Sequence, residues 1–300
     1  MKNKLVVRIS EGLGNQLFMY ANAYSLAKKI NYELLIDNVS AYRKLKIRDY
    51  LLHKFNISAA TSKSTFIHNS FPLYIKHKFR KKIDIFFKKK SFLSEQKDSN
   101  KNTFYNPHNL NNLSSKIYLE GYYQSEKYFY DYRDEIKKEF SINNISENNL
   151  CIDPNIIKKV NSVSIVVRTN RFSENNSNTK NIERSNNFVK NTFEYIKKSI
   201  NFFKNKLDNP QFFLFSNDFL DFKNIFNEKN IFLIDNKNDK AISDFYLSSL
   251  CKNFIIGPST FHWWSAYLSN YSNKICIRPP DNLKFSSNKD IYPDDWINLK

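Results

Sequence analysis

The chain has 300 residues, which is enough for one large domain or two domains of ordinary size. Hydrophobic residues make up 41% of it and aromatic residues 16%, so we expect a buried core rather than a disordered chain. The formal net charge of +18 favours polyanionic partners, namely nucleic acid, an anionic membrane surface or phosphorylated small molecules, without choosing among them.

The cysteines and the apolar runs restrict the compartment. Cys151, Cys251 and Cys276 are odd in number and include no C-x-x-C pair, so neither a disulfide framework nor a zinc ribbon is supported. The apolar run near the N-terminus is too short for a signal peptide, and no stretch approaches the length of a membrane span. We expect a cytoplasmic protein, and peripheral attachment to the inner face of the cytoplasmic membrane stays open.

The chain opens with a predicted strand, a glycine loop and a predicted helix. KLVVRI (4–9) reads as a buried strand, apolar residues recur at helical spacing from Asn15, and YELLID (32–37) is a second strand. Gly12 and Gly14, two of only four glycines, lie in the loop, where they would let a ligand approach the N–H groups at the helix start. An ordinary βα turn is an equal alternative, because GLGN is not G-x-G-x-x-G.

The middle of the chain, 51–118, has weaker patterns. Between 73 and 90 one helical face collects a set of apolar side chains, Ile75, Phe79, Ile83, Phe86 and Phe87. Lysine and arginine surround this face, a combination that suits a helix on an anionic membrane. A helix that packs this face on the core and exposes a basic side is the favoured interpretation. After it, 118–140 predicts an aromatic turn and a helix, and 141–149 a polar linker.

The second half alternates regularly between strands and helices. Strands are predicted at 162–168, 211–216, 230–235, 253–257 and 274–279, and helices at 187–203, 218–226, 239–252 and 259–270. This alternation with short connections indicates a parallel sheet covered by helices on both faces. We therefore predict an α/β protein with two halves, 1–155 and 156–300.

Polar residues follow three of these strands, at the ends where α/β sheets bind ligands. Arg168 closes SIVVR and its guanidinium suits a diphosphate, with a salt bridge at the rim as an equal alternative. Ser216 or Asp218 in FSND could bind a base or a ribose, and Asp218 could instead cap a helix. Ser259 and Thr260 begin a predicted helix whose first N–H groups could hold a phosphate, although capping is the commoner use of such hydroxyls.

The sequence contains no clear motif for a metal site, a catalytic nucleophile or nucleic-acid binding. The five histidines are scattered, and neither a D-x-D motif nor a G-x-S-x-G elbow occurs. We therefore expect no cofactor and no metal, with a bound diphosphate neutralised by arginine, lysine and backbone N–H groups. No nucleic-acid-binding signature occurs either. A polyanion-binding protein without catalysis stays as the alternative of a different class, and it predicts nucleic-acid binding that weakens steeply with salt.

Six short motifs follow one another along the chain: GLGNQLFMYA (12–21), GYYQSEKYF (121–129), FSND (215–218), DFYLSSLC (244–251), STFHWWSAYL (259–268) and YPDDWINL (292–299). Together they resemble the bacterial α-1,2-fucosyltransferases of glycosyltransferase family 11. The resemblance implies a GT-B fold, in which two Rossmann-like halves face each other across a cleft. It also implies a metal-independent, inverting transfer of L-fucose from GDP-fucose to the 2-hydroxyl of a sugar, often galactose. The implied acceptor is an oligosaccharide or a lipid-linked glycan of a bacterial surface polymer such as lipopolysaccharide or O-antigen.

The resemblance also implies roles for individual residues. Arg168 would contact the β-phosphate, and Asn15 would border the reacting groups. A general base would assist the acceptor hydroxyl; the sequence offers Glu174, just beyond the altered box, and Glu11 as candidates, without a choice between them. The residues that it places around the donor are Gly12, Gly14, Asn15, Gln16, Arg168, Arg171, Ser216, Asp218, Ser259, Thr260 and Phe261.

One box of the family, H-x-R-R-x-D, is altered in this chain. Val166 stands where the family has His, Arg168 keeps the first Arg, Thr169 replaces the second and Arg171 replaces Asp. Arg171 could restore the second positive charge from another position. The change leaves open a family member that uses another GDP-sugar, or one that binds the donor without transferring it. His262, where the family has Ser, is a smaller departure.

Overall fold

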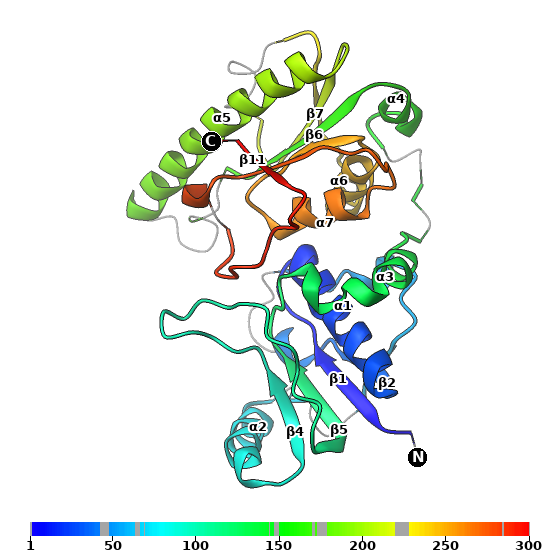
Figure 1. The fold of residues 1–300 in the computed structure, drawn as a ribbon, viewed down its shortest axis with the longest axis vertical. Helices are drawn as coiled ribbons and strands as arrows, with labels where there is room; N and C mark the ends of the chain where they lie inside the picture. The colour runs from blue at the N-terminus through cyan, green and yellow to red at the C-terminus, as the bar shows by residue number, and fades with distance from the viewer. Residues whose placement is uncertain are drawn as a thin grey trace. The chain divides into compact units, whose positions relative to one another are not determined.

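The computed structural model describes residues 2–42, 48–63, 67–68, 70–143, 145–146, 150–169, 172, 179–219, 228–283 and 285–299. The chain divides into two compact units, one formed by Met1–Asn143 with Ser286–Pro293 and the other by Asn144–Phe285 with Asp294–Lys300. Each unit holds a parallel sheet with helices, as the sequence predicts for each half (Figure 1). The division lies inside the predicted linker 141–149, twelve residues before the predicted boundary after residue 155, and a short stretch near the C-terminus returns to the first unit.

The first unit is built on a sheet with the strand order β3-β2-β1-β5-β4, in which every pairing is parallel. Its strands are β1 (Lys4–Arg8), β2 (Glu33–Asp37), β3 (Ala60–Thr61), β4 (Lys90–Ser94) and β5 (Leu113–Glu120). The helices described in it are α1 (Leu13–Ile30), α2 (Phe71–Ile83) and α3 (Arg133–Glu139), with 3-10 turns at 40–42, 52–54, 84–86, 126–128 and 130–132. Since β1 is the central strand, the glycine loop that follows it lies at the middle of the sheet's carboxyl edge.

Helix α1 is the buried centre of this unit. Every residue from Leu13 to Ala27 except Asn15 is buried, because small and apolar side chains occupy all sides of the helix. The helix ends at Asn31, which adopts the left-handed conformation that commonly closes a helix. Asn15 thus stands out as the partly exposed polar residue in the first turn.

The second unit is built on a parallel sheet with the strand order β11-β10-β9-β6-β7-β8. Its strands are β6 (Ser162–Val167), β7 (Gln211–Ser216), β8 (Ile231–Ile234), β9 (Asn253–Ile255), β10 (Cys276–Arg278) and β11 (Ile297–Asn298). The helices described in it are α4 (Pro154–Lys159), α5 (Thr179–Lys206), α6 (Lys240–Ser249) and α7 (Thr260–Leu268), with a 3-10 turn at 281–283.

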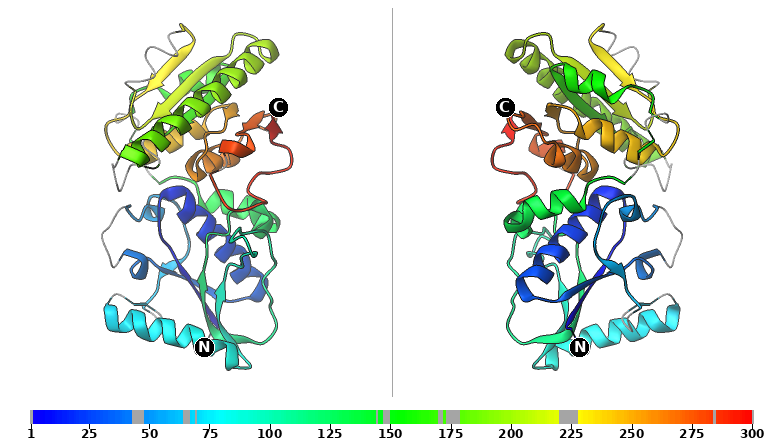
Figure 2. Two further views of the ribbon diagram at one scale, coloured as in Figure 1. Left: turned by 90° about the vertical axis from the view of Figure 1, so that its left-hand side faces the viewer. Right: turned by 90° about the vertical axis from the view of Figure 1, so that its right-hand side faces the viewer.

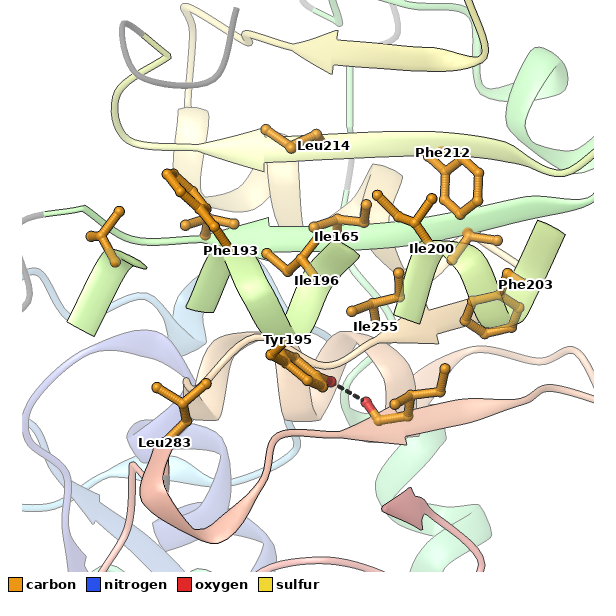
Figure 3. Close-up of a cluster of buried hydrophobic side chains, with 14 residues drawn as sticks. Ile165, Phe193, Tyr195, Ile196, Ile200, Phe203, Phe212, Leu214, Ile255 and Leu283 are labelled. Carbon is orange, nitrogen blue, oxygen red and sulfur yellow. Dashed lines mark hydrogen bonds between the residues drawn. The ribbon is translucent and has the colours of Figure 1, made fainter. Parts of the chain in front are cut away.

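The core of the second unit lies between α5 and its sheet. Figure 3 shows side chains of α5 packed against those of β6, β7 and β9: Phe193, Ile196, Ile200 and Phe203 against Ile165, Phe212, Leu214 and Ile255. Burying each such side chain contributes about 1.5–3 kcal/mol. The Tyr195 hydroxyl lies 2.7 Å from the carbonyl oxygen of Ile277, to which it donates, so the one polar atom in this cluster is satisfied.

The predicted helix between 73 and 90 needs two corrections. Helix α2 ends at Ile83, so Phe86 and Phe87 lie beyond it, and β4 begins at Lys90. The apolar face does not pack on the core, because Phe79 is 63% exposed and Phe86 84% exposed. Helix α2 is the cyan coil in both views of Figure 2. It packs on its sheet through His77, which lies 3.3 Å from Glu120.

Three further sequence predictions concern residues 113–120, the helix 218–226 and the length of the apolar segments. Residues 113–120 form the long strand β5, which the sequence did not predict, and its last three residues fall in the segment 118–140 that was expected to begin with an aromatic turn. The predicted helix 218–226 lies almost wholly outside the described residues. Among the helices that the structure describes, none has the length and apolar character needed to span a membrane.

Candidate functional site

Three loops of the second unit meet at one edge of its sheet. Strand β6 lies between β7 and β9, with Val167 opposite Ser216 and Ile165 opposite Ile255. All three strands are parallel, so the segments that follow them emerge side by side. The predicted site residues Arg168, Ser216, Asp218, Ser259, Thr260 and Phe261 belong to these segments, and the topology brings them to one edge.

The loops after β6 and β7 are tied together beside Arg168. The Thr169 backbone N–H donates to the Asn217 side-chain oxygen at 3.1 Å, and the Asn217 amide donates to the Thr169 hydroxyl at 3.1 Å. Ser216 is buried, and its hydroxyl donates to the Asp218 carbonyl at 2.6 Å, so it closes its own turn. Thr169, which replaces an arginine of the family box, therefore fixes the loop that carries the half-buried Arg168.

The loop after β9 approaches β6 so closely that only glycine fits at position 257. A Cβ atom on Gly257 would lie 2.0 Å from the Val166 carbonyl oxygen. The Gly257 N–H donates to Nδ1 of His262 at 2.8 Å, and Nε2 of His262 lies 3.1 Å from the Ser164 hydroxyl. His262, which replaces a serine of the family motif, is fully buried and clamps the loop to the sheet.

The start of α7 is capped by Ser259 and is partly exposed. The Ser259 hydroxyl accepts the His262 N–H at 3.2 Å, so the capping interpretation is correct for this side chain. Thr260 and Phe261 are partly exposed, and Phe261 packs edge-on against Phe245. The helix has no acidic residue in its first turn, which leaves its positive end uncompensated by carboxylates of its own.

Burial lowers the pKa of His262 to about 3, so the folded state holds a neutral imidazole. The unfolded chain binds this proton below a pKa of 6.5, and the folded chain does so only near 3, so stability falls as the pH drops through this interval. We expect the second unit to lose about 2 kcal/mol between about pH 6.5 and pH 5. The measurement is denaturant unfolding followed by tryptophan fluorescence.

Tryptophan reports on this unit alone, because Trp263, Trp264 and Trp296 all belong to it. The matched variant is His262→Gln, whose side-chain oxygen can accept the Gly257 N–H but does not titrate. Its stability should be nearly constant over the same interval. An unchanged pH slope in this variant would contradict the assignment to His262.

The carboxyl edge of the first unit is organised by Gln16. Its fully buried amide donates to the carbonyl oxygens of Glu11 and Asp49, both at 2.7 Å, and accepts the Leu51 N–H at 2.9 Å. Both N–H groups of this amide are therefore used inside the protein. Gln16 therefore fixes the glycine loop through these three hydrogen bonds.

Asn15 joins two of the motifs seen in the sequence. Its side-chain oxygen accepts from the Gln124 amide at 2.7 Å, and the Gln124 oxygen accepts from the Ser286 hydroxyl at 2.5 Å. The Tyr122 hydroxyl lies 3.5 Å from the exposed Glu11 carboxylate. Residues far apart in the sequence thus converge beside the first turn of α1.

The backbone conformation of the glycine loop does not require a glycine at position 12. Gly12 has an ordinary extended conformation, and a Cβ atom added to it would meet nothing within 4 Å. The residue with a positive φ is Glu11, at 66°. Open space lies beside Gly12, α1 has no side-chain cap, and Gly14 is buried in the first turn.

The sequence reasoning overlooked a charged cluster at this same edge. Arg8, Asp37 and Glu120 close β1, β2 and β5, and the Arg8 side chain lies 3.4 Å from Glu120. Burial raises the pKa of Glu120, but His77, Lys81 and Arg8 together lower it to about 2. The sequence does contain a signal for this cluster. Each of the three residues is charged and ends an apolar strand, which is the criterion that identified Arg168 as a candidate.

The remaining candidates fall outside what can be placed. Arg171 and Glu174 lie outside the described residues. Across the described ranges, no group of three His, Cys, Asp or Glu side chains is arranged to hold a metal ion.

Comparison with known proteins assigns the chain to a family. The model of the family described as glycosyl transferase family 11 matches residues 2–300. The chain belongs to glycosyltransferase family 11. This confirms the resemblance that the six motifs indicated, and it makes the protein a glycosyltransferase.

Two relatives in family 11 come from Escherichia coli. The O-antigen biosynthesis glycosyltransferase WbnK is 29% identical, over 97% of this chain and 99% of its own length. An alpha-1,2-colitosyltransferase is 27% identical, over 99% of both chains.

Two solved structures share the fold of this family 11 chain. The alpha-1,6-fucosyltransferase NodZ soaked with GDP-fucose has a TM-score of 0.51 and 13% identity, and the match covers 89% of this chain and 93% of NodZ. A mutant of FUT1 from Arabidopsis thaliana in complex with GDP has a TM-score of 0.50 and 12% identity, covering 94% of this chain and 71% of FUT1. The parallel sheet in each unit fits the two Rossmann-like halves of a GT-B protein, which confirms the predicted fold class.

Proposed function

We propose that the chain transfers a fucose-type 6-deoxyhexose from its GDP-activated form to the 2-hydroxyl of a sugar, with inversion and without a metal ion. The acceptor is a galactoside or a similar residue in an oligosaccharide or lipid-linked glycan of a bacterial surface polymer. The observation that carries the proposal is the edge where Arg168 and the start of α7 emerge from adjacent parallel strands. An arginine and a helix N-terminus are both well suited to binding a diphosphate.

The proposed chemistry follows from the charge that develops. When the bond between the anomeric carbon and the diphosphate oxygen breaks, both bonding electrons leave with GDP, and negative charge grows on the β-phosphate. Arg168 and the first N–H groups of α7 would stabilise this charge as it forms. The acceptor hydroxyl attacks the opposite face of the sugar and loses its proton to a general base, for which Glu174 and Glu11 are the candidates.

A second donor is favoured by one comparison. The relative named as a colitosyltransferase raises the alternative that the donor here is GDP-colitose. Colitose is fucose without the hydroxyl at carbon 3, so one hydroxyl separates the two substrates. A site that hydrogen-bonds this hydroxyl rejects the deoxy sugar by about 10⁴-fold, whereas a site that leaves it in water discriminates weakly.

The test compares donors on the purified protein in the presence of EDTA. GDP-fucose, GDP-colitose and GDP-mannose are each supplied with lactose, and release of GDP, transfer and the linkage of the product are measured. We expect transfer from a fucose-type donor, an α-linked product at the 2-hydroxyl, and no loss of rate on chelation. The ratio of kcat/KM for the first two donors identifies the sugar.

Calorimetric titration with GDP and UDP separates the alternatives. Binding of GDP but not UDP, with no turnover of any donor, would indicate a family member that has lost transfer. No binding of either nucleotide, together with nucleic-acid binding that falls steeply with salt, would favour the non-catalytic polyanion-binding alternative.

A further inference from the structure

Helix α2 is fixed to its sheet through one polar face. The ring of His77 is buried and packs edge-on against Phe92 and Tyr118, with centroids 5.4 and 5.1 Å away. Lys81, one turn further on, pairs with Glu120. Asp84 continues the same side of the segment and accepts the backbone N–H of Ser91 at 2.9 Å, so the helix is held against β4 and β5.

The opposite face of α2 presents hydrophobic side chains to solvent. Sixteen large hydrophobic side chains are exposed among the described residues, and seven of them lie within 71–87: Phe71, Leu73, Ile75, Phe79, Ile85, Phe86 and Phe87. Phe71, Ile75 and Phe79 follow one another at four-residue spacing, so they form a stripe along the helix. Monomeric proteins rarely expose such a concentration unless it contacts something.

Positive charge surrounds this stripe. Lys76, Lys78, Lys82, Lys88 and Lys89 are all exposed. Asp84 is the one carboxylate of 71–90, a range that the structure describes completely, and it is buried against β4. The exposed surface of 71–90 is therefore apolar and basic, without an exposed acidic side chain.

We propose that this surface, formed by α2 and residues 84–90 and called the α2 surface below, binds the face of an anionic lipid bilayer. The phenylalanine and isoleucine side chains enter the boundary between headgroups and acyl chains, and the lysines extend their alkyl stems over it to reach lipid phosphates. Protein–protein interfaces are depleted of lysine at their centre, which argues against a protein partner. A second copy of the chain would bring two positive surfaces together.

Binding of the α2 surface to a bilayer does not depend on which donor sugar the protein uses. It concerns where the protein works, since a glycosyltransferase held at a membrane surface meets lipid-linked acceptors at high local concentration. Because charge and apolar area both contribute, neither should suffice alone: zwitterionic vesicles should bind poorly, and so should anionic vesicles at high salt.

The experiment is flotation of the full-length protein with vesicles containing about 30% phosphatidylglycerol in phosphatidylethanolamine. We expect binding of the native chain, and at least about tenfold weaker partitioning for Lys88→Glu/Lys89→Glu. Phe86→Ser/Phe87→Ser should weaken binding to a similar degree while leaving the charge unchanged. The matched control is Lys197→Glu/Lys198→Glu on α5, which makes the same change of net charge with exposed lysines of the other unit.

Thermal unfolding of each variant shows whether the fold is intact, which we expect because the substituted side chains are exposed. The proposal is overturned if the native protein stays unbound, or if the α5 variant loses binding as strongly as the α2 variants. The sedimentation coefficient of each variant is measured as well. The proposal is also overturned if Phe86→Ser/Phe87→Ser leaves vesicle binding unchanged but lowers the sedimentation coefficient, because a second copy of the chain would then cover the α2 surface in the native protein.

Discussion

Replacement of Arg168 by alanine is expected to lower kcat/KM for sugar transfer by about 30- to 10³-fold, which corresponds to about 2–4 kcal/mol of transition-state stabilisation. The negative charge of the leaving diphosphate is larger in the transition state than in the bound donor, so the loss should exceed the loss in GDP affinity. Steady-state kinetics together with calorimetric titration of GDP measures both quantities.

Two variants make the Arg168 result specific. Arg168→Lys keeps the charge but not the planar pair of donors, so we expect an activity between those of the native protein and the alanine variant. Thr169→Val removes the hydroxyl that accepts from the Asn217 amide but keeps the backbone N–H that donates to the Asn217 oxygen, so it should act more weakly, through the position of the loop. Native turnover in Arg168→Ala would refute the proposed role of this residue.

The regular part of the fold is predictable because its apolar runs are long. Strands β1 and β6 each carry three consecutive apolar residues and β7 carries four, as expected for a parallel sheet buried on both faces. Strand β5 was missed because Ser114, Ser115 and Lys116 open it, and its apolar character appears only near its end. Strand β4 was missed because the helical pattern of α2 was extended through Phe87.

The spacing of the apolar residues in α2 did not predict which face of the helix packs on the sheet. A stripe of apolar residues at helical spacing predicts a buried face in most globular proteins. Here the buried contacts are polar, since Glu120 at the end of β5 attracts His77 and Lys81. That carboxylate lies 39 residues from Lys81 in the sequence, so its influence becomes visible only once the sheet is assembled.

The candidate site was foreseen as residue types and positions rather than as contacts. Charged and hydroxyl residues at strand ends identified Arg168 and Ser259, because parallel strands deliver their carboxyl ends to one edge. The sequence did not reveal that Gln16 uses its whole amide internally or that Asn15 binds Gln124. These partners lie in loops whose course depends on packing.

Replacement of Gly257 by alanine is expected to cost about 3 kcal/mol or more of folding stability in the second unit. The new Cβ atom would lie 2.0 Å from the Val166 carbonyl oxygen, and a backbone oxygen inside a sheet cannot rotate away. The loop and the start of α7 would have to move, so transfer activity should fall together with stability. Denaturant unfolding followed by tryptophan fluorescence measures the first effect, and the donor assay measures the second.

Gly12→Ala is the matched control, and it also tests why this chain keeps a glycine in its first loop. Since nothing lies within 4 Å of the added Cβ atom and Gly12 has a negative φ, its stability should change by less than about 1 kcal/mol. If the open space beside α1 is filled by substrate during the reaction, activity should nevertheless fall. Loss of activity at unchanged stability would assign Gly12 to the ligand, whereas full activity would make the first loop an ordinary βα turn.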